Sequence, residues 1–450
     1  MSKFKIAFLY ILLASILWSC QEETAPIVIN PEHFHESVDR TTEVIIHDIF
    51  SPPVASRIYA YPNIAAYEIL AESNSDFVPL SGQLTDLAPI KKAPTENYNP
   101  ELAALVAHMD MSRRLIFSED MLTVYRDSLY GVWSKNNPKE YGTSKAYGLE
   151  VAEHIASWMD KDNYKQTRTM PKFAVTTGDD SRWQPTPPSY MEGIEPHWNK
   201  IRPFVIDSAA QFKPVAPPDF SLNKDSDFYK ELKEVYDISQ EITAKGDSSE
   251  EIEIAQFWDC NPYVSVTRGH LMFATKKITP GGHWMGIAKI ASLKANFEVT
   301  ETVHTYAKAS IAMADAFISC WDEKYRSNLV RPETLINENI DDSWQPILQT
   351  PPFPEYVSGH SVVSGAASEA LTSIFGDNFS FNDTTEVPYG LPIRNFKSFR
   401  SAAQEAAISR MYGGIHYRAA VDNGLDQGIA LGKFVVNKLK TKTNTTTASN

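Results

Sequence analysis

A cation and a histidine flank a glycine pair in the stretch SRMYGGIHYR, residues 409–418. Arg410 stands six residues before His416, and the Gly413-Gly414 pair between them predicts a chain break or a close helix crossing. An imidazole in this position can be a core residue, a metal ligand or a nucleophile. Taken alone, the stretch is more typical of a buried histidine beside a tight crossing, so its meaning depends on the other candidate residues.

A second stretch, PPFPEYVSGHSVVSGAASEAL, places Ser358-Gly359-His360 directly before an Ala- and Val-rich segment. We expect this segment to form a helix that begins near Ser361. The first amides of a helix lack intrahelical partners and carry the positive end of the dipole, so they bind anions readily. The alternative is a plain capping serine with an incidental histidine.

The third stretch is CWDEKYRSNLVRPET, in which Lys324 and Arg331 are seven residues apart. On a continuous helix the two side chains project in nearly the same direction, and Trp321 joins that face one turn earlier. Pro332 indicates that the helix ends there. Two cations on a helix face usually mark a solvated surface. Together with the other two stretches, however, they complete the set of cations, amides, hydroxyl and imidazoles that a tetrahedral oxyanion needs.

In order and internal spacing, the three stretches resemble the signature KX6RP, SGH and SRX5H of the type 2 phosphatidic acid phosphatase and vanadium haloperoxidase superfamily. Here the three parts run over residues 324–332, 358–360 and 409–416. Each part alone is weakly specific, whereas the ordered trio is a strong signal. It covers only the C-terminal part of the chain, while the helical N-terminal half resembles the larger, two-bundle members of the haloperoxidase branch.

By this resemblance, five positions bind the anion. The side chains of Lys324, Arg331 and Arg410 neutralise its charge. Ser358 and the amide of Gly359 donate hydrogen bonds to its oxygens. The anion is orthovanadate in the haloperoxidases, and phosphate can occupy the same site in the phosphatases, because vanadate rests in the geometry through which phosphate passes.

The remaining positions take part in the reaction or face the halide. His416 is the single protein ligand to vanadium, or in a phosphatase the nucleophile that forms a phosphohistidine. His360 is the acid–base in either case, and Lys324 is the third catalytic residue of a haloperoxidase. Trp321 and Phe353 match aromatic positions near the halide side of the chloroperoxidase-type pocket.

The resemblance therefore predicts a vanadate-dependent haloperoxidase, which oxidises a halide with hydrogen peroxide to hypohalous acid. The alternative is a secreted acid phosphatase that hydrolyses a phosphomonoester through a phosphohistidine at the same site. Soluble phosphatases of this superfamily are typically shorter, and its lipid phosphatases usually span a membrane several times. A third hypothesis, a non-enzymatic surface lipoprotein that captures ligands with its Trp and Tyr residues, leaves the cationic spacing unexplained.

Two positions depart from the family pattern. Val357 replaces the proline that usually precedes SGH, which we expect to change loop rigidity more than chemistry. Ala420 stands where the family commonly has an aspartate that orients the motif histidine. The first carboxylate after His416 is Asp422, which lies two residues further on and about 200° around a helix. Another carboxylate or a backbone carbonyl must replace the aspartate, and its loss would harm a nucleophile more than a metal ligand.

Composition excludes some partners. The chain has 450 residues, a net charge of -14, 43% hydrophobic residues and 22% charged residues. An ordinary globular core is expected from these values. A broad nucleic-acid interface needs a basic surface, so we expect no nucleic-acid partner.

The N-terminus predicts export. Two lysines in MSKFK precede an apolar run that is too short to span a bilayer, so residues 1–19 are predicted to be a signal peptide. LWSC at 17–20 resembles the lipobox of bacterial lipoproteins, in which Cys20 is lipidated; the alternative is an ordinary signal peptide and a chance cysteine. We expect an outer-membrane lipoprotein facing the periplasm or the cell surface, attached only through this lipid. Cys260 and Cys320 then lie where a disulfide is permitted.

Apolar residues recur with helical spacing through most of the chain, and no strand-like alternation is sustained. We therefore predict an all-α fold. Residues 20–222 form an N-terminal helical region that ends in a proline-rich excursion from residue 170. Residues 223–440 form a phosphatase- and haloperoxidase-like bundle, followed by a disordered tail over 441–450. FWDCNP (257–262) and GGHW (281–284) are predicted to be ordered loops beside the bundle, and His283 is assigned no chemistry.

Overall fold

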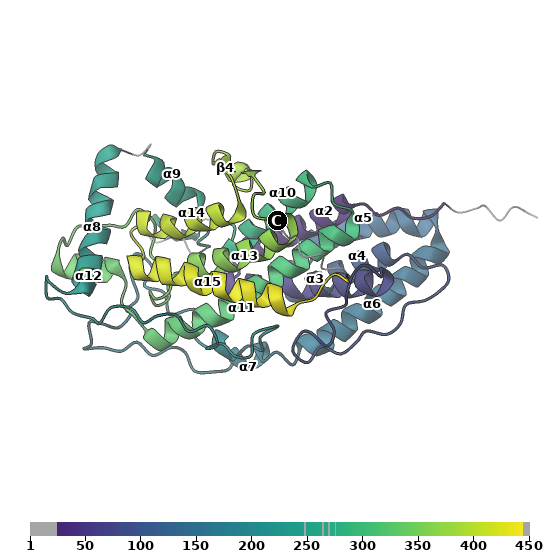
Figure 1. Ribbon diagram of the computed structural model, residues 1–450, viewed down its shortest axis with the longest axis horizontal. Helices are drawn as coiled ribbons and strands as arrows, with labels where there is room; N and C mark the ends of the chain where they lie inside the picture. The colour runs from purple at the N-terminus through teal and green to yellow at the C-terminus, as the bar shows by residue number, and fades with distance from the viewer. Residues whose placement is uncertain (1–24, 247–248, 263–264, 269–270, 275, 444–450) are drawn as a thin grey trace, which may run out of the picture.

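Helices build an elongated molecule with the N-terminal helices at one end and the C-terminal helices toward the other (Figure 1). The computed structural model describes residues 25–246, 249–262, 265–268, 271–274 and 276–443. The predicted signal peptide, Cys20 and residues 444–450 of the predicted tail lie outside this part of the chain. The prediction of an all-α fold is confirmed.

The N-terminal helices begin at residues suited to helix starts. α3, α4 and α6 each combine a proline in the first turn with a capping side chain, from Ser51, Asn99 and Asn137, that accepts a hydrogen bond from a backbone amide. These residues satisfy amides that would otherwise lack a partner. The helices are α2 (Pro31–His47), α3 (Pro52–Ser73), α4 (Pro100–Leu115), α5 (Asp120–Asn136), α6 (Pro138–Met159) and the short α7 (Tyr164–Thr167).

The C-terminal part contains the longest helix and two short hairpins. Its helices are η1 (Trp198–Lys200), α8 (Asp227–Lys245), α9 (Glu250–Phe257), α10 (Pro280–Lys294), α11 (Val299–Ser327), α12 (Pro332–Asn339), α13 (Gly359–Phe375), η2 (Val387–Tyr389), α14 (Phe399–Tyr412) and α15 (Arg418–Lys438). The antiparallel pairs are β1 (Ser265–Arg268) with β2 (Leu271–Ala274), and β3 (Phe381–Asp383) with β4 (Arg394–Phe396). Within the described residues, strands are confined to these two hairpins.

Helix α11 runs through the centre of the molecule (Figure 1). It packs against α3 in the N-terminal half and against α13 in the C-terminal half. Nearly every side chain from Val299 to Lys324 is buried, and one continuous hydrophobic core includes residues of both halves. The division at residue 222 stays a prediction.

Two sequence-based expectations about helix ends are wrong. α11 ends at Ser327, where Asn328 adopts a left-handed conformation with φ 48°. Lys324 and Arg331 therefore do not share a continuous helix, and the chain reversal after α11, rather than helical periodicity, brings Arg331 back toward Lys324. Asn tolerates this conformation better than most residues, which explains why the helix stops before Pro332.

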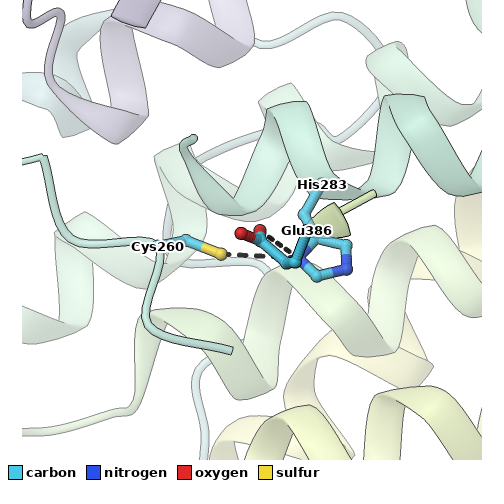
Figure 2. A group of neighbouring side chains, drawn as sticks. All are labelled: Cys260, His283 and Glu386. Carbon is cyan, nitrogen blue, oxygen red and sulfur yellow. Dashed lines mark hydrogen bonds and ion pairs between the residues drawn. The ribbon is translucent and has the colours of Figure 1, made fainter. Parts of the chain in front are cut away.

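The GGHW stretch is the first turn of α10 rather than a loop. Thr279 caps this helix by accepting a hydrogen bond from the Gly282 amide at 3.1 Å, and Pro280 occupies the first helical position. His283 is thereby fixed in a buried position facing Cys260 and Glu386 (Figure 2). The prediction that His283 has no chemistry was made without knowledge of this cluster.

The start of the predicted disordered tail is ordered. The Thr441 hydroxyl bonds to His304 at 2.8 Å, and the Thr441 carbonyl accepts a hydrogen bond from the hydroxyl of Tyr67 at 2.9 Å. Lys442 forms a β-bridge with Phe77. These long-range contacts hold a segment whose composition alone is typical of disorder.

The proline-rich excursion packs along the C-terminal bundle. The Asp315 carboxylate, in the middle of α11, accepts hydrogen bonds from the amides of Phe204, Val205 and Ile206 at 2.7, 2.8 and 3.0 Å. The Ile194 amide donates to the Pro352 carbonyl at 3.1 Å. Because Pro352 immediately precedes Phe353, the excursion helps to position one wall of the candidate site.

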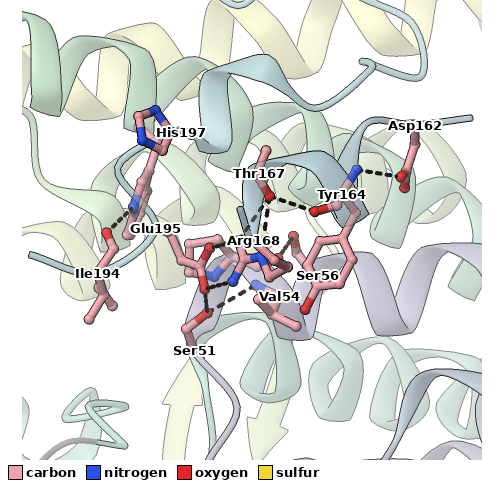
Figure 3. A network of polar contacts seen from close by, with 12 residues as sticks. Ser51, Val54, Ser56, Asp162, Tyr164, Thr167, Arg168, Ile194, Glu195 and His197 are labelled. Carbon is pink, nitrogen blue, oxygen red and sulfur yellow. Dashed lines mark hydrogen bonds and ion pairs between the residues drawn. The ribbon is translucent and has the colours of Figure 1, made fainter. Parts of the chain in front are cut away.

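A polar network joins the start of α3 to α7 and the excursion (Figure 3). Glu195 accepts hydrogen bonds from the Ser51 hydroxyl at 3.2 Å and from Arg168 at 2.9 Å. On the other side of α7, Asp162 accepts from the Tyr164 amide at 2.9 Å. The network fixes the chain at Ser51, directly before Pro52, which lines the candidate site.

Glycines on α15 allow its close contact with α13. Gly424, Gly428 and Gly432 recur every fourth residue, and a Cβ at Gly428 would collide with the backbone of Val362 on α13. This crossing matters for function because α13 carries the SGH motif at its start and α15 follows His416.

We expect Gly428→Ala to force α13 and α15 apart and to lower the free energy of unfolding by about 1–3 kcal/mol. Urea unfolding followed by circular dichroism measures this change. Gly142→Ala on α6 is the matched control, because no atom lies within 4 Å of the added Cβ. It should stabilise the helix by about 0.5–1 kcal/mol. Equal effects of the two substitutions would contradict the close crossing.

Candidate functional site

The three motif stretches meet at one pocket. Its free volume is about 460 Å³, counting the part that opens toward solvent. The end of α11, the start of α13 and the α14–α15 turn contribute to its wall. The lining residues are Pro52, Cys260, Asn261, Pro280, Phe317, Trp321, Pro351, Phe353, Gly359, His360, Arg410, Ile415 and His416.

His416 lies in the turn between α14 and α15, and both of its ring nitrogens have defined neighbours. Nδ1 lies 2.7 Å from a carboxylate oxygen of Glu355, and Nε2 lies 3.1 Å from Nη1 of Arg331. Since a guanidinium only donates, Nε2 must be the acceptor and Nδ1 carries the proton. Burial, followed by the charges of Arg331 and Lys324, holds the pKa of His416 well below its usual value. The imidazole is therefore neutral, and its unprotonated Nε2 can act as a metal ligand when Arg331 gives up this bond.

Glu355 replaces the aspartate that the family commonly places at position 420. The same carboxylate oxygen that contacts His416 also accepts the Tyr417 amide at 3.0 Å. Burial raises the pKa of Glu355 to about 8, against the opposing effect of Arg331 and Lys324. Sequence reasoning missed this residue, because only the fold brings a loop before α13 to the turn before α15.

The two positions considered for this role from sequence lie elsewhere. Asp422 is exposed and thus cannot orient the buried histidine. Ala420 contributes its carbonyl to a different contact, accepting the Ser358 amide at 3.0 Å. The backbone of Ala420 therefore positions the SGH motif, while Glu355 orients His416.

Two buried arginines lie at the pocket: Arg410 lines it from α14, and Arg331, directly before α12, contacts His416. Arg331 donates to the carbonyls of Phe353 and Ile415 at 3.0 and 2.8 Å, and its Nη2 is buried without a hydrogen-bond partner. Arg410 donates to the Ser409 hydroxyl at 2.9 Å and to the Ala255 carbonyl at 3.1 Å. Burial lowers the pKa of Arg331 to about 10 and also lowers the pKa of Arg410.

Lys324 is fully buried behind the pocket wall. Its ammonium donates to the carbonyls of Pro354, Glu355 and Val357 at 3.1, 3.0 and 2.5 Å. All three protons are thus directed at the loop before α13, so Lys324 must exchange one of these bonds to contact an anion. Burial lowers the pKa of Lys324 to about 7.

The SGH motif forms the N-terminus of α13. Ser358 is the N-cap, and its hydroxyl oxygen accepts the Ser361 amide at 3.2 Å. A Cβ at Gly359 would meet Trp321 at 3.6 Å and Lys324 at 3.9 Å, so the backbone lies directly against both residues. The helix begins two residues earlier than expected from sequence, which places the Gly359 and His360 amides in its first turn.

His360 lines the pocket, and its Nε2 is buried without a hydrogen-bond partner. Burial and the charges of Arg410 and His283 hold the pKa of His360 well below its usual value. His360 is therefore a neutral group able to accept a proton at the pocket surface.

Aromatic rings form another part of the wall. The rings of Trp321 and Phe353 lie 5.1 Å apart between centroids. The Phe353 ring also contacts the two cations behind it, with Nζ of Lys324 at 4.9 Å and the guanidinium carbon of Arg331 at 5.1 Å. The halide-pocket residues predicted from sequence thus lie beside the cationic groups.

These residues fit a tetrahedral oxyanion such as vanadate. Three cationic side chains converge, and the neighbouring Arg331 contributes, after burial, to lowering the pKa values of Lys324 and His416. Arg331 Nη2 and His360 Nε2 are buried donors or acceptors without a partner. A bound anion would supply the missing countercharge and acceptors. The unprotonated Nε2 of His416 would be its protein ligand.

The cysteines do not contribute a disulfide here. Cys260 and Cys320 are both free and buried, so the disulfide that the sequence permitted between them is not formed. No helix within the described ranges has the length and apolar character needed to cross a membrane.

A helical bundle that encloses a cationic pocket, with one carboxylate-held histidine and a helix N-terminus, defines an oxyanion-binding enzyme site. Comparison with known proteins identifies the class. Residues 304–343 and 337–445 match the family described as the VCPO second helical-bundle domain. No match was found among curated protein sequences.

Solved structures extend the similarity to the whole fold. A bacterial vanadium-dependent iodoperoxidase is 67% identical, with a TM-score of 0.91, 94% of this chain covered and 100% of that chain covered. A holo-type bacterial vanadium-dependent chloroperoxidase is 17% identical, with a TM-score of 0.68 and coverage of 92% and 98%. Its apo-type counterpart is also 17% identical, with a TM-score of 0.64 and coverage of 86% and 94%; these two share the fold.

The chain belongs to the vanadium-dependent haloperoxidase family. It is an enzyme that uses vanadate as its cofactor and hydrogen peroxide to oxidise a halide.

Proposed function

We propose that the physiological halide is iodide. The observation that carries this proposal is the 67% identity to an iodoperoxidase over all of that chain. The apolar wall made by Trp321, Phe353 and Phe317 is consistent with iodide. A large, weakly hydrated anion loses less solvation energy on entering such a pocket than chloride does. Iodide is also the most easily oxidised of the three common halides.

Within the proposed site, each residue has a distinct task. The vanadium ligand is Nε2 of His416, whose orientation is fixed by Glu355 at 2.7 Å. Arg331 and Arg410 neutralise the anion, and Lys324 joins them by exchanging one of its carbonyl bonds. The hydroxyl of Ser358 and the Gly359 amide donate to the anion's oxygens from the start of α13. When bound, vanadate supplies a Lewis-acidic centre that makes hydrogen peroxide reactive toward the halide.

His360 is the proton acceptor and donor of the proposed reaction. Its neutral form at ordinary pH allows Nε2 to take a proton from entering hydrogen peroxide. The resulting imidazolium can return a proton to the oxygen that leaves as water. His360 lies on the pocket wall and its Nε2 has no hydrogen-bond partner, which is consistent with this task.

The halide proposal is tested with purified protein loaded with vanadate and assayed with iodide, bromide and chloride in hydrogen peroxide. We expect kcat/KM for iodide to exceed that for bromide by more than about tenfold, or about 1.4 kcal/mol in the barrier. The control is the same protein without vanadate, which should be inactive. Faster oxidation of bromide or chloride than of iodide would contradict the proposal.

We also propose, from the LWSC sequence alone, that the chain is exported and attached to the outer membrane through a lipid on Cys20. Expression in a Gram-negative host followed by fractionation tests this. The wild type should sediment with membranes and incorporate labelled palmitate, whereas Cys20→Ser should do neither. Equal membrane recovery of the two proteins would contradict lipid attachment.

A further inference from the structure

Beside the vanadate pocket, three buried side chains with metal-ligating atoms face one another. They are Cys260, which also lines the pocket, His283 in the first turn of α10, and Glu386 directly before η2 (Figure 2). Their sulfur, nitrogen and oxygen atoms all lie within 4.8 Å of one another. The three residues come from segments that are distant in the sequence, so only the tertiary fold creates the cluster.

The separations match a tetrahedral zinc site. Nδ1 of His283 lies 3.6 Å from the Cys260 sulfur and 3.2 Å from a carboxylate oxygen of Glu386. Tetrahedral angles with Zn–S of about 2.3 Å and Zn–N and Zn–O of about 2.0–2.1 Å place these pairs about 3.6 and 3.3 Å apart. Both pairs that include His283 therefore stand at ligand spacing, and the Cys260 sulfur and the Glu386 carboxylate lie within 4.8 Å of each other.

The opposite nitrogen of His283 is held as in many metal sites. Its Nε2 lies 2.9 Å from the Asp383 carboxylate and 2.7 Å from the Thr385 hydroxyl. Asp383 is itself fixed by the Thr385 amide and hydroxyl at 3.0 and 2.6 Å. A carboxylate on one imidazole nitrogen fixes the ring and leaves the other nitrogen for a metal.

A second observation also points to a ligand. The Glu386 carboxylate oxygen nearest Nδ1 is buried, and its contact within the described residues is the His283 ring at 3.2 Å, which is itself a member of the cluster. Glu386 is only 6% exposed, so water does not readily satisfy this oxygen. The Trp258 ring stacks on His283 at 4.4 Å and closes the cluster from one side. A cation between the three side chains would satisfy this oxygen, which is otherwise costly to bury, once Nδ1 of His283 has given up its proton.

We propose that Cys260, His283 and Glu386 bind a divalent transition-metal cation, with Zn²⁺ as the first candidate. A thiolate, an imidazole and a carboxylate at tetrahedral spacing favour Zn²⁺, whereas Mg²⁺ and Ca²⁺ prefer oxygen ligands alone. On binding, Cys260 loses its thiol proton and His283 loses the proton on Nδ1, both to solvent, while the Nε2 proton stays on the hydrogen bond to Asp383. The charges of the Cys260 thiolate and Glu386 then balance the two charges of the cation.

The cation would join the segment after α9, the start of α10 and the turn after β3. This matters for the neighbouring pocket because Cys260 forms part of its wall and the Trp258 backbone bonds to His360. The role is thus to hold the wall beside the catalytic histidine. The inference does not rest on the choice of halide.

The test is the zinc content of the purified full chain after equilibration with Zn²⁺ and removal of excess by a weak chelator. We expect about one zinc per chain in the wild type and less than about 0.1 in Cys260→Ser and His283→Gln. Cys320→Ser, which removes a buried cysteine outside the cluster, should keep the zinc. A wild type without zinc, or variants that retain it, would overturn the proposal.

A second measurement tests the site even if the Cys260 and His283 variants do not fold. Cobalt is substituted into the folded Cys320→Ser protein, which leaves Cys260 as the cysteine able to bind it in the described part of the chain. The proposal predicts a thiolate-to-cobalt charge-transfer band with strong visible bands of tetrahedral cobalt. Cobalt that binds without the thiolate band, or not at all, would contradict the site. Vanadium content is measured in parallel and should be unchanged by Cys320→Ser.

Discussion

Glu355→Gln is expected to lower the affinity for vanadate by about 10- to 100-fold. The carboxylate lies 2.7 Å from Nδ1 of His416 and also accepts the Tyr417 amide. It fixes the ring so that Nε2 faces the pocket, and the hydrogen bond that it accepts from Nδ1 makes Nε2 a stronger ligand. A glutamine keeps the size and one acceptor but cannot ionise, and its amide oxygen is a weaker acceptor than a carboxylate, so the fold should survive while the ligand weakens. Isothermal titration calorimetry with vanadate measures the change in affinity.

Glu369→Gln is the matched control for this substitution. Glu369 is also a buried glutamate, but it lies further along α13 and pairs with Arg400. Its replacement should leave vanadate affinity within about twofold of the wild type. If Glu355→Gln bound vanadate as tightly as Glu369→Gln, another group would have to orient His416. The assignment of Glu355 to the role of the usual aspartate would then be wrong.

The second prediction concerns pH and Lys324. Burial lowers the pKa of this lysine to about 7 in the protein without anion. A nearby anion favours the ammonium form and raises this pKa, so vanadate binding takes up a proton when the pH exceeds about 7. The contribution of Lys324 to affinity is therefore constant below pH 7. Above it, this contribution declines by up to about tenfold per pH unit.

The measurement is the ratio of wild-type to Lys324→Met affinity for vanadate between about pH 6 and pH 9. The ionisation of vanadate itself affects both proteins and cancels in the ratio, which should fall as the pH rises above 7. Lys308→Met is the control, because Lys308 is a buried lysine on the same helix whose pKa burial lowers to about 8. Its ratio should not change with pH. A ratio for Lys324→Met that does not change with pH would show that the Lys324 ammonium does not interact with the bound anion.

The sequence predicted the parts of this site that depend on local spacing. The SGH motif could be recognised because a helix N-terminus is encoded by neighbouring residues, and Ser358 does cap α13. The assignment of His416, Arg331 and Arg410 to one pocket rested on the ordered motifs; His416 and Arg410 line the pocket, and Arg331 contacts His416. Their catalytic and binding roles stay proposals that the substitutions test.

The parts that could not be predicted depend on long-range contacts. Glu355 reaches His416 across 61 residues, and no pattern within either segment marks the pair. The Cys260 cluster likewise needs His283 and Glu386 to be brought from separate segments. The helical-face argument for Lys324 and Arg331 was wrong because a left-handed Asn328 ended the helix, although the chain reversal still gave the expected proximity.

The most direct test of the site is a vanadate titration of the wild type and His416→Ala, with bound vanadium and iodide oxidation measured on the same samples. Circular dichroism and thermal unfolding confirm that the variant is folded. The wild type should bind about one vanadium per chain, with activity proportional to occupancy, while His416→Ala should retain neither. Stoichiometric vanadium and full activity in His416→Ala would contradict the central claim that His416 holds the cofactor.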